Sequence, residues 1–229
     1  MKHELELNVR GESVPRWLFY SFLGRTYAYP DSNLIDLLFA KETWEQLSDA
    51  QAALELEADS TIRELRAWVE QHAGATEELL ADLEVEHTYL FINAVPHVPA
   101  SPYESAYAGR GLLMGESVSQ VLAAYRDAGL AISEDYDGLP DHIAAELEFM
   151  AYLLQQQAQA EEEDPEKAAT WKERQNRFLE EHLLRWGPVF LEKLASSTRN
   201  EFYRHLAGLL EALLQAEEQR ITALTPHRN

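Results

Sequence analysis

The sequence predicts an all-α protein, and three observations support that fold class. Leu occurs 34 times and Ala 30 times among the 229 residues, whereas Val and Ile together occur 15 times. Leu and Ala favour helices, and β-branched residues favour strands. Apolar residues recur at intervals of three and four, and prolines and glycines separate these periodic stretches. We therefore expect nine or ten helices, no strand and no internal repeat.

The first half of the chain, residues 1–92, contains four predicted helices. Ser13 and Pro15 form an N-cap and N1 pair, and the residues that follow are apolar on nearly all sides. Such a helix is expected to lie buried at the centre of the fold. The predicted helices lie at about 15–29, 34–39, Asp49–His72 and 77–91.

Residues 93–102 interrupt the helical pattern with three prolines, Pro96, Pro99 and Pro102. Proline removes a backbone donor and clashes with the preceding turn, so no helix is expected there. The spacing also fits a polyproline ligand, but an ordered crossover loop is the favoured interpretation. This loop is the expected hinge between the halves 1–92 and 103–229 of a single domain.

The second half, residues 103–229, starts with a short turn at Tyr103–Tyr107. Two capping boxes, Ser117 with Gln120 and Thr198 with Glu201, and two prolines mark the starts of four predicted helices. These helices start at Ser117, Pro140, Pro165 and Thr198. Asp164 is expected to cap the third, and Gly187-Pro188 is expected to end it. The core stripe of the third is expected to contain Trp171, Gln175, Phe178, His182, Leu183 and Trp186.

Charge and composition exclude several function classes. The chain has 40 acidic and 19 basic residues, a formal charge of −21, which disfavours nucleic acid and anionic lipid and favours a cationic partner. It has no cysteine, which excludes disulfides, thiolate metal sites and a cysteine nucleophile. No stretch is apolar enough for membrane insertion, and the N-terminus lacks a secretory pattern. We expect a cytoplasmic protein.

Known catalytic and cofactor motifs are absent from the sequence. There is no P-loop, and the glycine-rich stretch 109–115 has one residue too many for a dinucleotide fingerprint and follows no strand. Glu84 and His87 form the one Glu-x-x-His pair, whereas a di-iron bundle needs two. No metal site is predicted.

Two clusters of polar residues remain as candidate sites. Asp141 and His142 follow Pro140 in a first helical turn, and Glu146 lies four residues later on the same face. Tyr103 and Tyr107 flank Glu104 beside the proline loop and suit a polar-aromatic binding surface. Purely structural readings, a capping carboxylate with a buried histidine and a packed turn, remain open for both clusters.

Together these strings resemble the TorD/DmsD/NarJ family of molybdoenzyme-specific chaperones. Residues 86–91 resemble its aromatic-x-x-Leu-Phe motif, with His87 in place of the aromatic residue. Residues 102–107 resemble its proline-Tyr-Glu-Ser stretch. Residues 139–150 resemble its Asp-His helix, although Gly138 and Leu139 occupy the places of the usual Glu-Pro.

The resemblance implies a cytoplasmic, non-catalytic chaperone with a TorD-like fold. It would bind the apo catalytic subunit of a molybdopterin oxidoreductase and its twin-arginine leader, aid cofactor insertion and delay export until maturation. Carboxylates can bind the two guanidinium groups of such a leader, and a groove between helices can take its apolar stretch. No cofactor is expected, and binding of guanine nucleotide or molybdopterin is implied by the resemblance alone.

The residues expected to bind the peptide come from the matched motifs. Tyr103, Glu104, Asp141, His142 and Glu146 are expected to form a polar rim, with Tyr107 beside them and Leu90 and Phe91 on the groove floor or in the core beneath. Two alternatives are a small hydrolase or nucleotidase that uses His142 with Asp141 or Glu146, and an acidic interaction module. We expect a monomer with a tendency to domain-swapped dimers.

Overall fold

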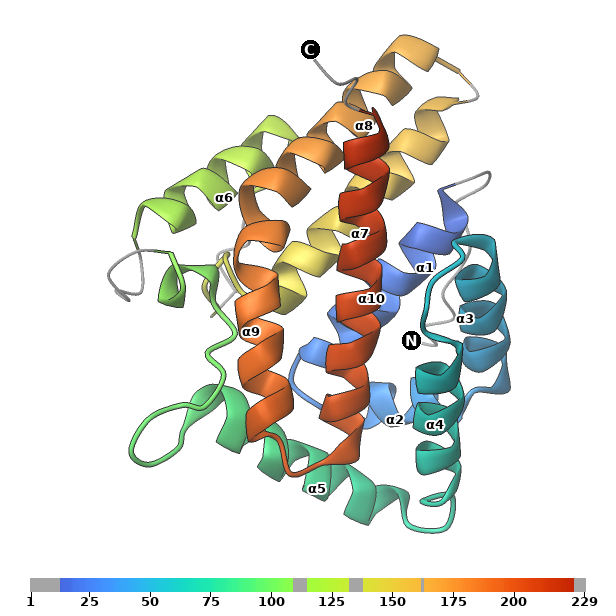
Figure 1. Cartoon of the computed structure of the whole chain (residues 1–229), viewed down its shortest axis with the longest axis vertical. Helices are drawn as coiled ribbons and strands as arrows, with labels where there is room; N and C mark the ends of the chain where they lie inside the picture. The colour runs from blue at the N-terminus through green and yellow to red at the C-terminus, as the bar shows by residue number, and fades with distance from the viewer. Residues whose placement is uncertain (1–12, 109–114, 132–137, 162, 225–229) are drawn as a thin grey trace.

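Helices make up nearly all of the regular structure in the computed structural model, which describes residues 13–108, 115–131, 138–161 and 163–224 (Figure 1). Over these ranges the backbone forms no strand beyond one isolated β-bridge, so the all-α prediction is confirmed. No described helix is both long and apolar enough to cross a membrane. The glycines at 109 and 111 and residues 135–137, which precede the helix start predicted at Pro140, lie outside the described residues.

The helices in chain order are α1 (Val14–Tyr27), α2 (Ser32–Phe39), α3 (Lys41–Ala53), α4 (Asp59–Glu70), α5 (Thr76–His87), α6 (Glu116–Asp127), α7 (Ile143–Glu161), α8 (Pro165–Phe178), α9 (Leu184–Ser197) and α10 (Glu201–Leu224). Two π-helical turns, η1 (Thr88–Ile92) and η3 (Leu179–Leu183), and one 3₁₀ turn, η2 (Glu104–Ala106), complete them.

Helix α1 is buried at the centre of the fold, as its uniform apolarity predicts. Its buried apolar residues are Trp17, Leu18, Phe19, Tyr20, Phe22, Leu23 and Tyr27. Gly24 allows α1 to approach α7 closely, because a Cβ atom there would lie 3.0 Å from Glu148 Cγ and 3.3 Å from the Glu148 backbone nitrogen. The central pair therefore joins a helix before the proline loop to a helix after it.

The remaining helices pack around this pair. In Figure 1, α10 lies in front of α1 and α7, with α9 along one side and α4 along the other. Helix α3 packs on α1, and α8 packs on α7. The two sequence halves thus share one hydrophobic core. The loop at 93–102 contains no helix, as predicted, and its role as a hinge stays a prediction.

The single helix predicted over Asp49–His72 is wrong. The chain leaves α3 at Ala53 and turns through residues 54–58, where Glu55 has a φ of +52°. Leu56 and Ala58 are buried in this turn. The break lets α3 pack on α1 while α4 packs on α10, which one straight helix could not do.

The predicted helix end at Gly187-Pro188 is also wrong. Helix α8 continues through the π turn η3 into α9, and Pro188 lies inside α9. Trp186 and Phe190, on either side of the proline, are buried in the core. Their burial outweighs the one backbone hydrogen bond that proline removes.

Three predicted helix starts need correction, whereas Asp164 caps α8 as predicted. Ser117 lies inside α6, one residue after its start at Glu116, so its capping box with Gln120 does not form. Helix α7 starts at Ile143 rather than Pro140. At α10 the Asn200 side chain accepts from the Phe202 amide, and Thr198 Oγ1 instead donates to Glu86 on α5.

Candidate functional site

Two of the motif strings are hydrogen-bonded to each other across 36 residues of chain. Tyr103 and His142 form the isolated antiparallel bridge. The Glu104 amide donates to the Asp141 carbonyl at 3.0 Å, and the Ile143 amide donates to the Pro102 carbonyl at 2.8 Å. We call residues 102–107 and 140–146 the junction, because this is where the end of the proline loop meets the start of α7.

The side chain of Asp141 strengthens this contact. Its Oδ2 atom accepts a hydrogen bond from the Ser105 amide at 2.8 Å, and the residue is fully buried. The Tyr125 hydroxyl, from α6, donates to the Pro140 carbonyl at 2.8 Å. The aspartate that the sequence suggested for binding therefore holds η2 against the start of α7.

Glu104, Asp141 and Glu146 form a buried acidic cluster, with exposed fractions of 4%, 0% and 0%. His182 Nδ1, from η3, lies 2.8 Å from Glu104 Oε2, and both side chains are buried. The Trp186 indole donates to Glu146 Oε2 at 3.1 Å. Burying three carboxyl groups is costly unless they are paired or protonated, so the contacts to His182 and Trp186 are needed for stability.

Glu146 is the cluster member held in its neutral form. Burial raises its pKa well above the ordinary value, and the nearby charge and hydrogen bond of Glu104 raise it further. The hydrogen bond from Trp186 acts in the opposite direction but does not reverse the shift. A second carboxyl group beside a buried one disfavours its ionisation.

Three partly exposed members of the junction, Tyr103, Tyr107 and His142, are aromatic. The Tyr103 and His142 rings meet edge to face with centroids 5.2 Å apart. Burial, with a smaller effect from the charge of His87, lowers the pKa of His142 to about 4, and its Nδ1 lies 3.1 Å from the Ala144 amide that donates to it. Because its pKa is about 4, His142 is neutral at physiological pH.

Tyr107 stacks on Trp186, with ring centroids 5.5 Å apart, and Lys193 lies over the Tyr107 ring.

The structure brings six of the eight predicted site residues together at the junction, while Leu90 and Phe91 lie in the core. Phe91 packs against His87 and Phe190, so the floor of the site is continuous with the core. The three carboxylates are buried and do not form an exposed rim. Their role in peptide binding stays a prediction.

Sequence reasoning placed His182 and Trp186 in the core stripe of their helix and did not connect them with the site. A histidine in an otherwise apolar stripe was the available signal, because a buried histidine needs a polar partner. That partner, Glu104, lies 78 residues earlier in the chain.

Over the described ranges, no group of three or more His, Asp or Glu side chains could hold a metal ion.

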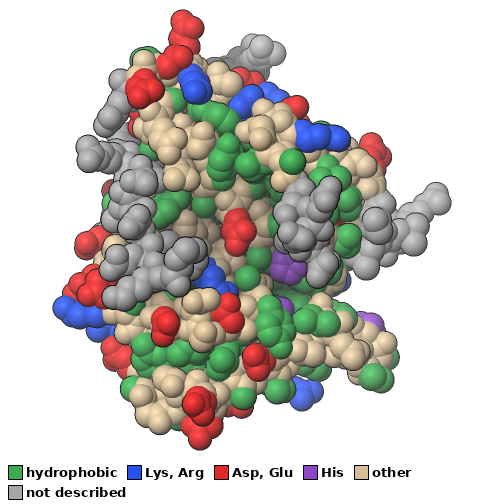
Figure 2. Space-filling view, turned by 180° about the vertical axis from the view of Figure 1, so that it is seen from behind, with side chains coloured by type: hydrophobic (Ala, Val, Ile, Leu, Met, Phe, Trp, Pro, Cys, Tyr) green, Lys and Arg blue, Asp and Glu red, His purple; other side chains and the backbone are tan. Residues whose placement is uncertain are grey.

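The surface seen from behind the view of Figure 1 is hollowed across its middle (Figure 2). Histidine side chains are visible in the hollow, and acidic side chains lie around it. A hollow bordered by acidic side chains can attract a cationic group.

Replacing Glu146 with glutamine is expected to change how stability depends on pH. The folded-state pKa of Glu146 lies above its ordinary value of 4.5, so the folded protein holds a proton that the unfolded chain releases as the pH rises. The contribution of Glu146 to the free energy of unfolding of the wild type is therefore complete below pH 4.5. It is lost as the pH rises through the pKa that Glu146 has in the folded protein.

The Glu146→Gln side chain stays neutral at every pH. The difference between the free energies of unfolding of the variant and the wild type should therefore shift in favour of the variant as the pH rises. Urea unfolding at a series of pH values measures this difference. Glu173→Gln, at an exposed ion pair, is the control and should follow the wild type. A constant difference between Glu146→Gln and the wild type would contradict the prediction.

The junction lies within a segment of the chain that matches a known protein family. A family model described as nitrate reductase delta subunit matches residues 42–192, which include the whole junction together with His182 and Trp186. The chain belongs to this family. The match covers most of the chain, and it starts within α3 and ends within α9.

The chain is also similar to individual proteins named as chaperones. The chain is 31% identical over 142 residues to the chaperone protein TorD of Photobacterium profundum, covering 62% of this chain and 64% of that protein. It is 28% identical over 186 residues to TorD of Vibrio vulnificus (strain YJ016), covering 76% and 85%. The resemblance to TorD is confirmed.

Two further comparisons concern a reductase chaperone and the fold. The perchlorate reductase assembly chaperone protein of Dechloromonas aromatica (strain RCB) is 30% identical over 135 residues, which is 59% of each chain. The chain thus spans less than two thirds of this relative and of the Photobacterium TorD. A crystal structure of a candidate redox enzyme maturation protein from Archaeoglobus fulgidus matches with a TM-score of 0.50 and 20% identity, covering 93% and 98%. This match supports the TorD-like fold.

Proposed function

We propose that this protein is a cytoplasmic, non-catalytic chaperone that binds the apo catalytic subunit of a molybdopterin oxidoreductase, including its twin-arginine leader. The observation that carries the proposal is the family match over residues 42–192. The names of the relatives, a TorD chaperone and a reductase assembly chaperone, support this class of function.

The geometry suggests how the junction takes part in binding. Tyr103 and His142 are partly exposed and can contact a peptide directly. The buried acidic cluster positions them, because Asp141 holds the two segments together and Glu104 is fixed by His182. Negative potential from the −21 chain would attract the two arginines of a leader over a distance of roughly one Debye length, about 10 Å at 0.1 M salt.

The hydrolase alternative has no support in the arrangement of its predicted residues. Asp141 Oδ2 accepts from the Ser105 amide rather than orienting His142. His142 Nδ1 accepts from the Ala144 amide, and Glu146 is fully buried beside Trp186. A histidine base of the predicted kind needs a carboxylate that orients it, and neither the Asp141 nor the Glu146 carboxyl group makes a hydrogen bond to the His142 ring within the described residues.

A synthetic twin-arginine peptide with an apolar stretch tests the proposal. We expect it to bind in a salt-sensitive way, and His142→Ala should weaken binding about tenfold, the loss of one hydrogen bond or ring contact worth about 1.4 kcal/mol. Asp141→Ala is unsuitable, because it would leave the Ser105 amide unsatisfied and destabilise the fold.

Isothermal titration measures the affinity, and two controls sharpen the result. His205→Ala, a partly buried histidine on α10 away from the junction, should bind like the wild type. A peptide with both arginines replaced by glutamine should bind weakly. Equal affinity for both peptides would contradict leader recognition, and unchanged affinity of His142→Ala would contradict the assignment to the junction.

Light scattering across a range of protein concentrations tests the proposed monomer and domain-swapped dimer.

A further inference from the structure

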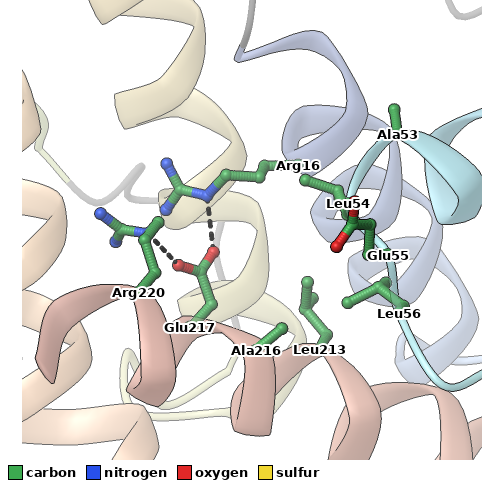
Figure 3. Close-up of a pocket in the computed structure, with 9 residues that line it drawn as sticks. All are labelled: Arg16, Ala53, Leu54, Glu55, Leu56, Leu213, Ala216, Glu217 and Arg220. Carbon is green, nitrogen blue, oxygen red and sulfur yellow. Dashed lines mark hydrogen bonds and ion pairs between the residues drawn. The ribbon is translucent and has the colours of Figure 1, made fainter. Parts of the chain in front are cut away.

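A pocket of about 330 Å³ lies at the opposite end of α1 from the junction (Figure 3). It is formed by the start of α1, the turn between α3 and α4, and the C-terminal half of α10. Arg16 lines the pocket, whereas Tyr27 lies about 16 Å further along α1 at about 1.5 Å per residue. The Tyr27 ring packs against Phe190, which also packs against Tyr107 of the junction. The proposed chaperone function does not use this pocket.

Two arginines approach one buried glutamate at the pocket. Arg16 Nε donates to Glu217 Oε1 at 2.7 Å, and Arg220 Nε donates to Glu217 Oε2 at 2.8 Å (Figure 3). The side chains of Arg16 and Glu217 are 10% and 2% exposed, and that of Arg220 is 26% exposed. Burial acts to raise the pKa of Glu217, but the two arginine charges lower it overall, so the glutamate is ionised.

The charges in this trio do not balance. Two guanidinium groups and one carboxylate leave one positive charge. Arg16 Nη1 donates to Gln175 and Arg220 Nη2 donates to Asn176, both neutral amides. Arg16 Nη2 and Arg220 Nη1 are buried and have no hydrogen-bond partner among the described residues. A buried cation without full compensation is costly, so an anion at this position would stabilise the fold.

The opposite wall of the pocket is apolar. Leu54 and Leu56 from the α3–α4 turn and Leu213 from α10 lie there with two alanines (Figure 3). An inorganic ion would leave this wall in contact with water, whereas a ligand with a hydrocarbon part would cover it. The exposed carboxylate of Glu55 is at the mouth and opposes an approaching anion.

We propose that this pocket binds a small organic anion, with its carboxylate or phosphate group on Arg16 and Arg220 and its apolar body on the leucine wall. Arg220 is the entry side, because it is the more exposed of the two arginines. The inference is independent of the proposed chaperone function.

Titration of the full-length protein with sodium hexanoate tests the proposal, with 1-hexanol and inorganic phosphate as probes of the two halves of the ligand. Hexanoate should bind and shift the NMR signals of the Arg16 and Arg220 Nε–H groups. Hexanol should bind at least about tenfold more weakly, because it lacks the charge. Phosphate should also bind more weakly than hexanoate, because it leaves the leucine wall uncovered.

Two substitutions at partly or fully exposed positions give effects of opposite sign. Arg220→Gln should weaken hexanoate binding at least about tenfold, and Arg16 still pairs Glu217 in this variant. Glu55→Gln removes the opposing charge at the mouth and should tighten binding. The anion site would be overturned if hexanoate and hexanol bound equally well. It would also be overturned if hexanoate shifted the NMR signals of Arg220→Gln as much as those of the wild type. Phosphate binding equal to that of hexanoate would overturn the role of the apolar wall.

Discussion

Replacing Glu217 with alanine is expected to lower the free energy of unfolding by about 3–5 kcal/mol. The change leaves the nearly buried Arg16 guanidinium without its carboxylate, and it removes the acceptor of the Tyr20 hydroxyl at 3.2 Å. An uncompensated buried charge costs much more than the loss of a solvent-exposed pair. For a chain of this size, such a loss corresponds to a fall in Tm of roughly 10 °C.

A matched control is available on α4. Arg66 Nε lies 2.7 Å from Glu70 Oε1, the same atoms and distance as in the Arg16–Glu217 pair, but these side chains are 42% and 59% exposed. Glu70→Ala should cost less than about 1 kcal/mol. Chemical denaturation of both variants measures the two losses. Equal losses would show that burial of Glu217 does not determine its contribution.

Replacing His182 with leucine is the second change with a large expected effect, a loss of about 3–5 kcal/mol at neutral pH. His182 is the partner of Glu104, and both are buried. Without it, the Glu104 carboxylate remains in the core beside Glu146, whose pKa is already raised by burial and by Glu104. A buried carboxyl oxygen that loses its hydrogen-bond partner is destabilising, and a second buried carboxyl group beside it adds to the cost.

A compensating change tests this explanation. In the His182→Leu/Glu104→Gln double variant no charge is left at position 104, so we expect at least half of the lost stability to return. Urea unfolding of the two variants and of Glu104→Gln alone completes a double-mutant cycle. If the double variant is less stable than His182→Leu, the loss arises from packing around Phe178 and not from the charge.

The all-α fold and most of its core could be predicted from local pattern. The apolar residues of α1 and the core stripe from Trp171 to Trp186 are buried as expected, because helical periodicity and burial of an apolar face are properties of neighbouring residues. The proline loop at 93–102 and the Asp164 cap follow from the chemistry of single residues. Motif order and spacing also predicted the family that the comparison confirms.

Tertiary contacts decided the features that local pattern predicted wrongly. The helix expected over Asp49–His72 breaks so that each part can pack on a different helix, and the helix expected to end at Pro188 continues because its flanking aromatic residues are buried. In both cases the free energy of packing exceeds the local preference of one or two residues.

The polar groups show most clearly which features local pattern determines and which features depend on tertiary contacts. The sequence by itself determined that acidic residues, tyrosines and a histidine gather in two motif strings. Only the tertiary structure decided that Glu104 faces His182, 78 residues away, and that Glu217 faces Arg16, 201 residues away. Such pairs are chosen by which surfaces meet when the helices pack, and a one-dimensional pattern does not contain that information. The neighbours that packing supplies then set which of these groups are ionised. Burial and Glu104 raise the pKa of Glu146, whereas Arg16 and Arg220 lower that of Glu217 against the effect of burial.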